Sequence, residues 1–137
     1  MRTKHIFGAW CVGIAAVLLA ACSAGSTNDP VARGQQIFHG EVALGDDIPT
    51  CISCHSVQAG EVGVIGTNLS NIGNRAAVTV PGQAPDDYLR TSIVNGDAFL
   101  AGGYQEGIHY RGYGDVLSRQ HIDDLVAYML TLRSGQD

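Results

Sequence analysis

The most reactive side chains of this sequence lie within five positions, in the stretch CISCH, which runs from Cys51 to His55. Two thiols three positions apart, followed at once by an imidazole, fit three kinds of site: a redox-active dithiol, half of a metal site, or the attachment point of a c-type haem. A zinc site needs four ligands, and the sequence has no second Cys pair or clustered His pair to supply them. A thioredoxin-type dithiol accompanies a βαβ pattern, which is not found downstream of residue 28.

The haem hypothesis explains both the residue types and their spacing. The thiols of Cys51 and Cys54 add to the two vinyl groups of the haem, and two intervening residues let both sulfurs reach the same edge of the ring. His55 then emerges beneath the iron, where it can bind as the proximal ligand. The sequence therefore predicts one covalently attached, iron-containing haem c.

The N-terminal segment has the pattern of an export signal that ends at a lipid anchor. A short basic start precedes an uncharged apolar run over residues 6–21, which is shorter than the ~20 residues of a spanning helix and fits a secretory signal. The run ends in Leu19-Ala20-Ala21-Cys22, which resembles the bacterial lipoprotein processing box. We expect residues 1–21 to be removed and Cys22 to carry the lipid. The alternatives are a retained membrane anchor and an ordinary cleavage that leaves Cys22 as a thiol.

Composition adds two constraints. Of the four cysteines, Cys11 would leave with the signal and Cys22 would take the lipid, so Cys51 and Cys54 remain for chemistry. The formal net charge is −5, and loss of the two basic residues of the signal makes it −7. An acidic surface argues against nucleic-acid binding and against simple adsorption to anionic lipid. It is also compatible with a charge that only keeps the protein soluble.

The remaining chain is predicted to be a lipidated tether, residues 22–28, followed by one domain, residues 29–137. The pair Asp29-Pro30 is typical of a helix start, and this helix should run to about His39. Pro85 starts a second helix, which has two acids in its first turn and a stop signal at Asn95-Gly96.

A third helix is predicted after Ser118. Its apolar side chains recur with the period of a helix, at Ile122, Leu125, Val126, Met129 and Leu130. Two long glycine-bearing loops, about 56–84 and 96–117, separate the three helices. Loops of this length are unusual in a compact domain, and a large buried ligand would explain them because loops can wrap around it.

With CxxCH between two such helices, the chain resembles the class I, mono-haem cytochromes c, which are small all-α electron carriers. The resemblance covers about residues 29–132. Gly34 and Phe38 in the first helix, and Tyr128 in the last, look like the glycine and the aromatic residues where the family's terminal helices cross. The resemblance implies a cytochrome c fold, in which about three core helices and long loops wrap a covalently attached haem.

The same resemblance extends to the middle of the chain. The stretches NLSNIGNRA (residues 68–76) and YLRTSIVN (residues 88–95) are similar to membrane-associated members of the family. By that likeness, Arg75 hydrogen-bonds a haem propionate, since a guanidinium fork suits a carboxylate. An ordinary surface arginine is the alternative.

The chain departs from the family at the sixth ligand of the iron, which is usually a methionine in a loop before the last helix. Relatives commonly read G-x-M-P-x-x-Y-G there. Set against Gly107 and Tyr113-Gly114 of this sequence, the methionine position falls on His109. An imidazole can replace the thioether as a strong axial ligand, so His109 is the predicted sixth ligand.

Three other side chains and an open site are alternatives to His109 as the sixth ligand. Met129 lies on the apolar face of the last helix, where a methionine more often fills the core. His39 follows the first helix too closely to cross the ring, and His121 lies in the first turn of the last helix. A five-coordinate or water-bound iron is the remaining alternative.

The resemblance implies a carrier of single electrons rather than an enzyme, with no small-molecule substrate. We expect it outside the cytoplasm, anchored by its lipid to the cytoplasmic or the outer membrane. Its partners would be redox proteins or the subunits of a respiratory or photosynthetic membrane complex, such as alternative complex III. Two other functions stay open: a haem-based sensor or small-ligand binder whose distal ligand is displaced, and an anchoring subunit whose haem is structural.

Overall fold

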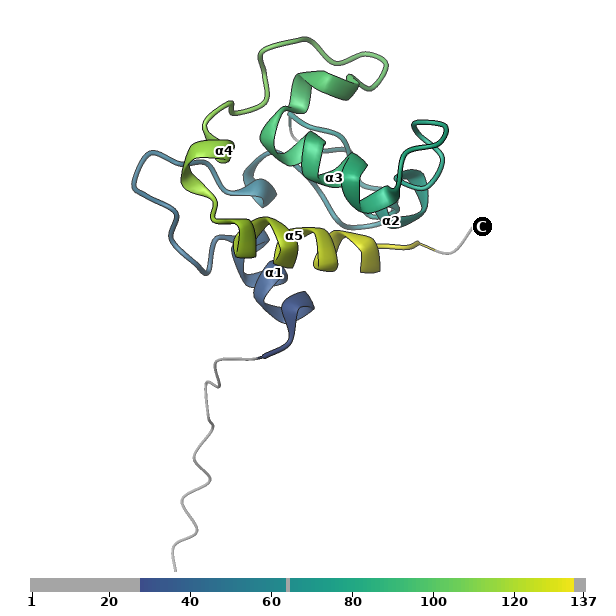
Figure 1. Ribbon diagram of the computed structural model, residues 1–137. Helices are drawn as coiled ribbons and strands as arrows, with labels where there is room; N and C mark the ends of the chain where they lie inside the picture. The colour runs from purple at the N-terminus through teal and green to yellow at the C-terminus, as the bar shows by residue number, and fades with distance from the viewer. Residues whose placement is uncertain (1–27, 64, 135–137) are drawn as a thin grey trace, which may run out of the picture.

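A computed structural model describes residues 28–63 and 65–134, and all regular secondary structure in these ranges is helical (Figure 1). The described part of the chain forms five α-helices and two short 3-10 helices: α1 (Pro30–His39), η1 (Cys51–Ser53), α2 (Ile72–Arg75), α3 (Pro85–Val94), η2 (Gly96–Phe99), α4 (Tyr113–Val116) and α5 (Arg119–Thr131). The predicted all-α fold with three longer helices is confirmed. The predicted signal and Cys22 lie outside the described residues.

No helix within the described ranges is both long enough and apolar enough to cross a lipid bilayer.

The helix starts follow from local capping. The Asp29 carboxylate accepts a hydrogen bond from the Val31 N–H at 3.0 Å and so caps α1, which ends at Gly40 in a left-handed conformation (φ 78°). The Ser118 hydroxyl accepts a hydrogen bond from the His121 N–H at 3.1 Å and caps α5. Each contact satisfies a backbone donor that has no partner within the helix. Both starts were predicted from the sequence.

The end of α3 lies where it was predicted, but for a different physical reason. The stop signal at Asn95-Gly96 implied a glycine in the left-handed conformation. Asn95 instead ends the helix with φ −142°, and Gly96, which is not among the glycines with positive φ, begins η2. A glycine is needed here because another segment of the chain passes very close to its Cα, as described below.

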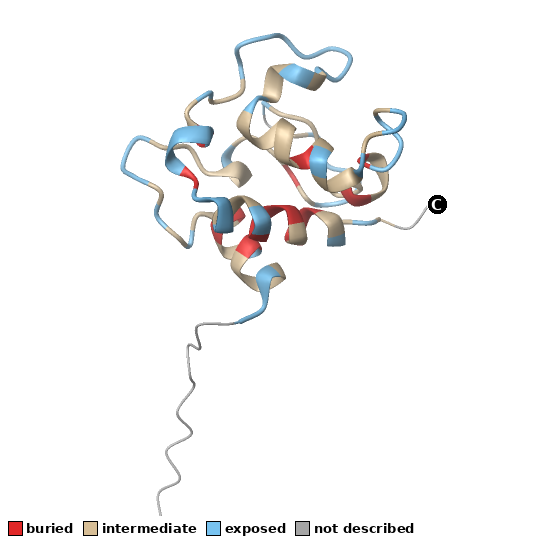
Figure 2. Ribbon diagram, in the orientation of Figure 1, coloured by how far each residue is buried: buried red, intermediate tan, exposed pale blue. Residues whose placement is uncertain are grey.

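The crossing of α1 and α5 is the most extensive contact between two elements of the described chain. In Figure 1, α1 lies below α5, and α3 lies above it. A Cβ added at Gly34 would lie 1.9 Å from the carbonyl oxygen of Asp124, so only glycine allows this approach. Beside it, Phe38 and Tyr128 pack edge to face with ring centroids 5.5 Å apart. Buried residues concentrate at this crossing (Figure 2).

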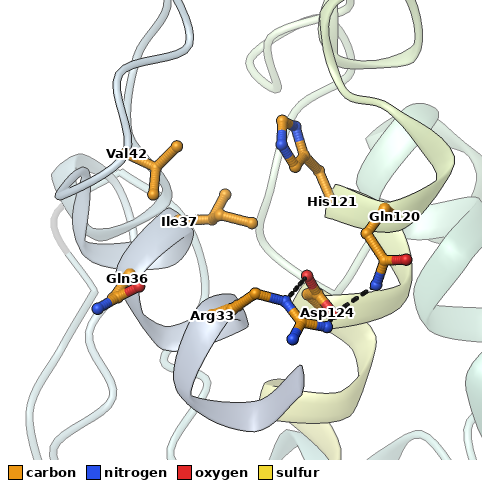
Figure 3. Close-up of a pocket in the computed structure, with 7 residues that line it drawn as sticks. All are labelled: Arg33, Gln36, Ile37, Val42, Gln120, His121 and Asp124. Atoms are coloured by element: carbon orange, nitrogen blue, oxygen red, sulfur yellow. Dashed lines mark hydrogen bonds and ion pairs between the residues drawn. The ribbon is translucent and has the colours of Figure 1, made fainter. Parts of the chain in front are cut away.

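A partly buried ion pair also joins α1 to α5 (Figure 3). Asp124 is only 1% exposed, and its two carboxylate oxygens accept hydrogen bonds from Nε and Nη2 of Arg33 at 2.8 and 2.7 Å. The Gln120 amide donates a third at 2.9 Å. A buried carboxylate is costly without such partners. The Arg33 hydrogen bond is the main reason that the pKa of Asp124 lies below its usual value.

The two predicted loops contain short helices that the sequence did not indicate. The four residues of α2 pack against α5, where the Gly73 N–H donates to the Leu132 carbonyl at 3.0 Å. The four residues of α4 are joined to the segment before CISCH, because the Tyr113 hydroxyl donates to the Pro49 carbonyl at 2.7 Å. Helices of one turn are too short to show a period in the sequence.

We expect Gly34→Ala to destabilise the folded protein by about 2 kcal/mol, because the added methyl group would force the two helices apart and overpacking costs ~1–3 kcal/mol. Chemical denaturation of the haem-loaded protein measures this change. Gly102→Ala is the matched control, since nothing lies within 4 Å of a Cβ at that exposed position. Equal stability of the two variants would contradict the importance of the crossing.

Candidate functional site

A large and mainly apolar cavity of about 520 Å³ lies inside the helices and loops. Its volume falls within the roughly 300–1,000 Å³ of small-molecule and cofactor sites. The helices contribute apolar wall residues, among them Phe38 from α1, Ile72 from α2, Leu89 and Ile93 from α3, Tyr113 from α4, and Leu125 and Met129 from α5. Both long loops contribute as well, so the elements that surround the cavity come from nearly the whole domain.

Cys51, Cys54 and His55 all line this cavity. The single turn of η1 brings them together: the Cys51 carbonyl accepts from the N–H of Cys54 at 3.2 Å and of His55 at 3.0 Å. The two cysteines are not joined by a disulfide, so each thiol is available for a thioether bond. Burial raises the pKa of the Cys51 thiol to about 11. The predicted attachment motif therefore faces a space of suitable size and polarity.

The His55 imidazole is oriented by the segment that follows it. Its Nδ1 lies 2.7 Å from the carbonyl oxygen of Thr67, and a carbonyl only accepts, so Nδ1 carries the proton and Nε2 has the free lone pair. Gly66 lies against the ring, because a Cβ there would be 2.4 Å from Cε1 of His55. Burial is the main cause that lowers the pKa of His55, which favours the neutral, metal-binding form.

His109 lines the same cavity, although it lies 54 positions after His55 in the sequence. It is half-buried, and its ring centroid is 5.4 Å from that of Tyr113. Its pKa is lowered first by burial and second by the charge on His55. The structure thus brings both predicted axial residues to one cavity.

Arg75 also lines the cavity and has an unsatisfied donor there. Its Nη2 donates to the Asn68 carbonyl at 2.6 Å, whereas its Nε is buried and has no hydrogen-bond partner among the described residues. Buried donors are almost always paired. Because Arg75 lines the cavity, its guanidinium can pair with a ligand carboxylate there, which is the arrangement expected of a haem propionate.

Large apolar side chains exposed to the cavity provide a second test of whether haem fits. Four of them line its wall and yet have 38–55% of their surface accessible: Ile65, Leu100, Tyr104 and Ile108. Exposed apolar groups that gather at one hollow mark a binding site for an apolar body. A haem ring in the cavity would cover them, so the residues present fit this cofactor.

The other candidate ligands are placed differently. His39 is not among the residues that line the cavity, and its Nε2 lies 3.4 Å from the Tyr128 hydroxyl. His121 also lies outside the cavity wall. Met129 does line it, as part of the buried core. Within residues 28–63 and 65–134, no three His, Cys, Asp or Glu side chains gather as a metal site.

Sequence reasoning missed the residues that hold the two histidines. Thr67 acts through a backbone carbonyl, which no residue type signals. Gly66 and Gly96 act through their missing Cβ, and each lies against a histidine ring. Asp97 lies beside the loop that carries His109. Glycines inside loops were the available signal, but the sequence alone does not say which of the 18 glycines lies against another segment.

Comparison with known proteins agrees with this geometry. A family model described as cytochrome c matches residues 31–133, which is most of the 137-residue chain. No curated protein and no solved structure matches the chain at the significance required. The chain belongs to the cytochrome c family, as a class I, mono-haem electron carrier with a covalently attached haem c.

Proposed function

We propose that this cytochrome is a lipid-anchored carrier that passes single electrons between protein partners, with His55 and His109 as the two axial ligands of its iron. The observation that supports the axial pair best is that both imidazoles line one cavity beside the CxxCH motif. When bound, the haem supplies a one-electron couple at its iron. The protein holds that haem, orients its ligands and excludes water from it.

Each group at the site has a distinct task in this proposal. Cys51 and Cys54 attach the ring covalently. His55 is prepared for ligation by the hydrogen bond from its Nδ1 to Thr67. His109 approaches from a separate loop, and burial keeps both imidazoles neutral by lowering their pKa. Arg75 pairs its guanidinium with a propionate, where a cation offsets the carboxylate charge.

The location and partners rest on the N-terminal sequence and on the family resemblance. Cys22, at the end of the apolar leader, would carry a lipid and hold the domain at the outer face of the cytoplasmic membrane or on the outer membrane. A tether over residues 22–28 spans at most about 25 Å when extended, so the domain stays close to the bilayer. This favours partners in the membrane, such as the subunits of a respiratory or photosynthetic complex like alternative complex III.

A second function is favoured by the position of the distal ligand on a loop. His109 belongs to a loop rather than to a helix, and it is only half-buried. A ligand on a loop can be displaced, which would open the iron to a diatomic molecule and make the protein a sensor or small-ligand binder. Rapid uptake of carbon monoxide by the reduced native protein would favour this function over electron transfer.

Substitution of His109 tests the ligand assignment. We expect His109→Ala to convert the low-spin iron to high spin and to open it to carbon monoxide. His109→Met should raise the reduction potential and introduce a sulfur-to-iron charge-transfer band. The identity of the axial ligand is one of the main determinants of the reduction potential, which spans a range of roughly 0.8 V among haem proteins. Paramagnetic resonance, near-infrared spectra and redox titration measure these changes.

The unmutated protein supplies the control for this experiment. Its oxidised spectrum should be that of a low-spin bis-imidazole haem without the sulfur band. A sulfur band before mutation would instead point to Met129, the methionine in the cavity wall. His121→Ala, which alters a histidine outside the cavity, should leave the spin state unchanged.

Arg75→Gln tests the propionate contact. Loss of the cation should lower the reduction potential, since a nearby positive charge favours the reduced iron; the expected shift is roughly 60 mV, a tenfold change for one electron. It should also raise the pKa of the propionate in the pH dependence of the potential. Arg119→Gln removes the same charge from an exposed position at the start of α5. If both variants shifted the potential equally, the effect would be one of net charge.

Cys22→Ser tests the anchor. Because one residue would carry the lipid and the domain folds around its own haem, the variant should be exported and soluble, with an unchanged haem spectrum. Fractionation of cells with a high-salt wash measures this. A variant that stayed with the membrane after the wash would show that the leader is retained or that a protein partner holds the domain.

A further inference from the structure

The loop that carries His109 is fastened on both sides of that residue to one carboxylate. Asp97, in η2, accepts a hydrogen bond from the Gly107 N–H at 2.9 Å. It also accepts hydrogen bonds from Nε and Nη2 of Arg111 at 3.2 and 2.6 Å. Residues 107 and 111 each lie two positions from His109. A single side chain therefore closes the loop around the predicted ligand.

The Asp97 side chain is better shielded from solvent than either of its two partners, which are both exposed. The Asp97 side chain is 14% exposed, whereas that of Arg111 is 68% exposed. The Gly107 N–H is the largest influence that lowers the pKa of Asp97, ahead of the Arg111 guanidinium. Exposed ion pairs contribute little to stability. The loop is thus held at two points, and the hydrogen bond to Gly107 holds the backbone itself.

Gly96, the residue before Asp97, lies directly against the His109 ring. A Cβ added at Gly96 would lie 2.3 Å from Cγ, 2.5 Å from Cβ and 2.7 Å from Nδ1 of His109. No side chain fits at that distance. The ring edge nearest the His109 backbone rests on the bare Cα of Gly96, and Nε2 is the nitrogen on the opposite side of the ring. This contact is the reason for a glycine after α3.

We propose that Gly96 and Asp97 are positioning residues, which together hold the His109 imidazole at the place where it binds the iron. The proposal rests on His109 as the sixth ligand. Gly96 provides a surface against which the ring rests, and Asp97 restrains the loop on both sides of the ring. Both residues line the same cavity as His109 and both belong to η2, so this short helix acts as the support for the distal ligand.

Gly96→Ala tests the support directly in the haem-loaded, full-length protein. The added methyl group would push His109 from its position, so a high-spin fraction should appear, and the reduced protein should bind carbon monoxide about tenfold faster, as expected when a contact of ordinary strength is lost. Gly102→Ala, an open position in the following loop, should change neither. Equal behaviour of the two variants would overturn the proposal.

A double-mutant cycle separates positioning from general damage. In the His109→Ala background there is no distal ring to displace, so Gly96→Ala should not alter the carbon monoxide rate further. An undiminished effect in that background would overturn the proposal. If His109→Ala itself left the iron low-spin, the ligand assignment would be wrong; a high-spin His109→Ala with an unaffected Gly96→Ala would refute the positioning role alone.

Asp97→Ala is a second test of the positioning role, and it decides the question if the Gly96→Ala protein does not incorporate haem. It should raise the carbon monoxide rate more than Arg111→Ala does, because it removes both loop contacts rather than one of them. Asp97→Asn should recover part of the loss, since an amide oxygen still accepts from Gly107. Asp123→Ala breaks a comparable ion pair with Arg90 elsewhere and is the control. Equal rates for the Asp97 and Asp123 variants would contradict the proposal.

Discussion

The direct backbone contact between α1 and α5 at Gly34 is the constraint on which the rest of this structure depends. These helices lie at opposite ends of the domain sequence, and their contact at Gly34 brings Phe38, Leu125 and Met129 to one wall of the cavity. The Arg33–Asp124 pair strengthens the same crossing. Without a glycine at this point the helices could not approach, and the wall against which the haem packs would lose its shape.

The haem completes a core that the polypeptide alone leaves open. Apolar side chains such as Leu100 and Ile108 line the cavity and still have about half of their surface accessible. The free energy of burying them is obtained when an apolar ring covers them. This explains why a domain with so much loop can be stable: the loops pack on the cofactor rather than on each other. The thioether bonds then keep that part of the core in place.

Much of the fold and of the haem site could be predicted from the sequence, and particular residues show why. Asp29, Pro85 and Ser118 start helices through local backbone chemistry, and the apolar period of α5 is visible over three turns. CxxCH has a spacing set by the haem itself. Asp124 could not be recognised, because a carboxylate in an apolar helix face looks like a solvent-facing residue until its partner 91 positions away is known. Gly96 matched a helix stop, whereas its role comes from a tertiary contact with His109.

The hydrogen bond between His55 and Thr67 spans only 12 positions, and Gly96 is similarly close in sequence to His109. Closing a short loop costs less conformational entropy than closing a long one. Each half of the iron site can therefore take shape by itself early in folding, before the terminal helices meet across the whole domain. Folding of this cytochrome would then be limited by the joining of two prepared halves, a step of high contact order, with the covalently held haem as the surface on which they meet.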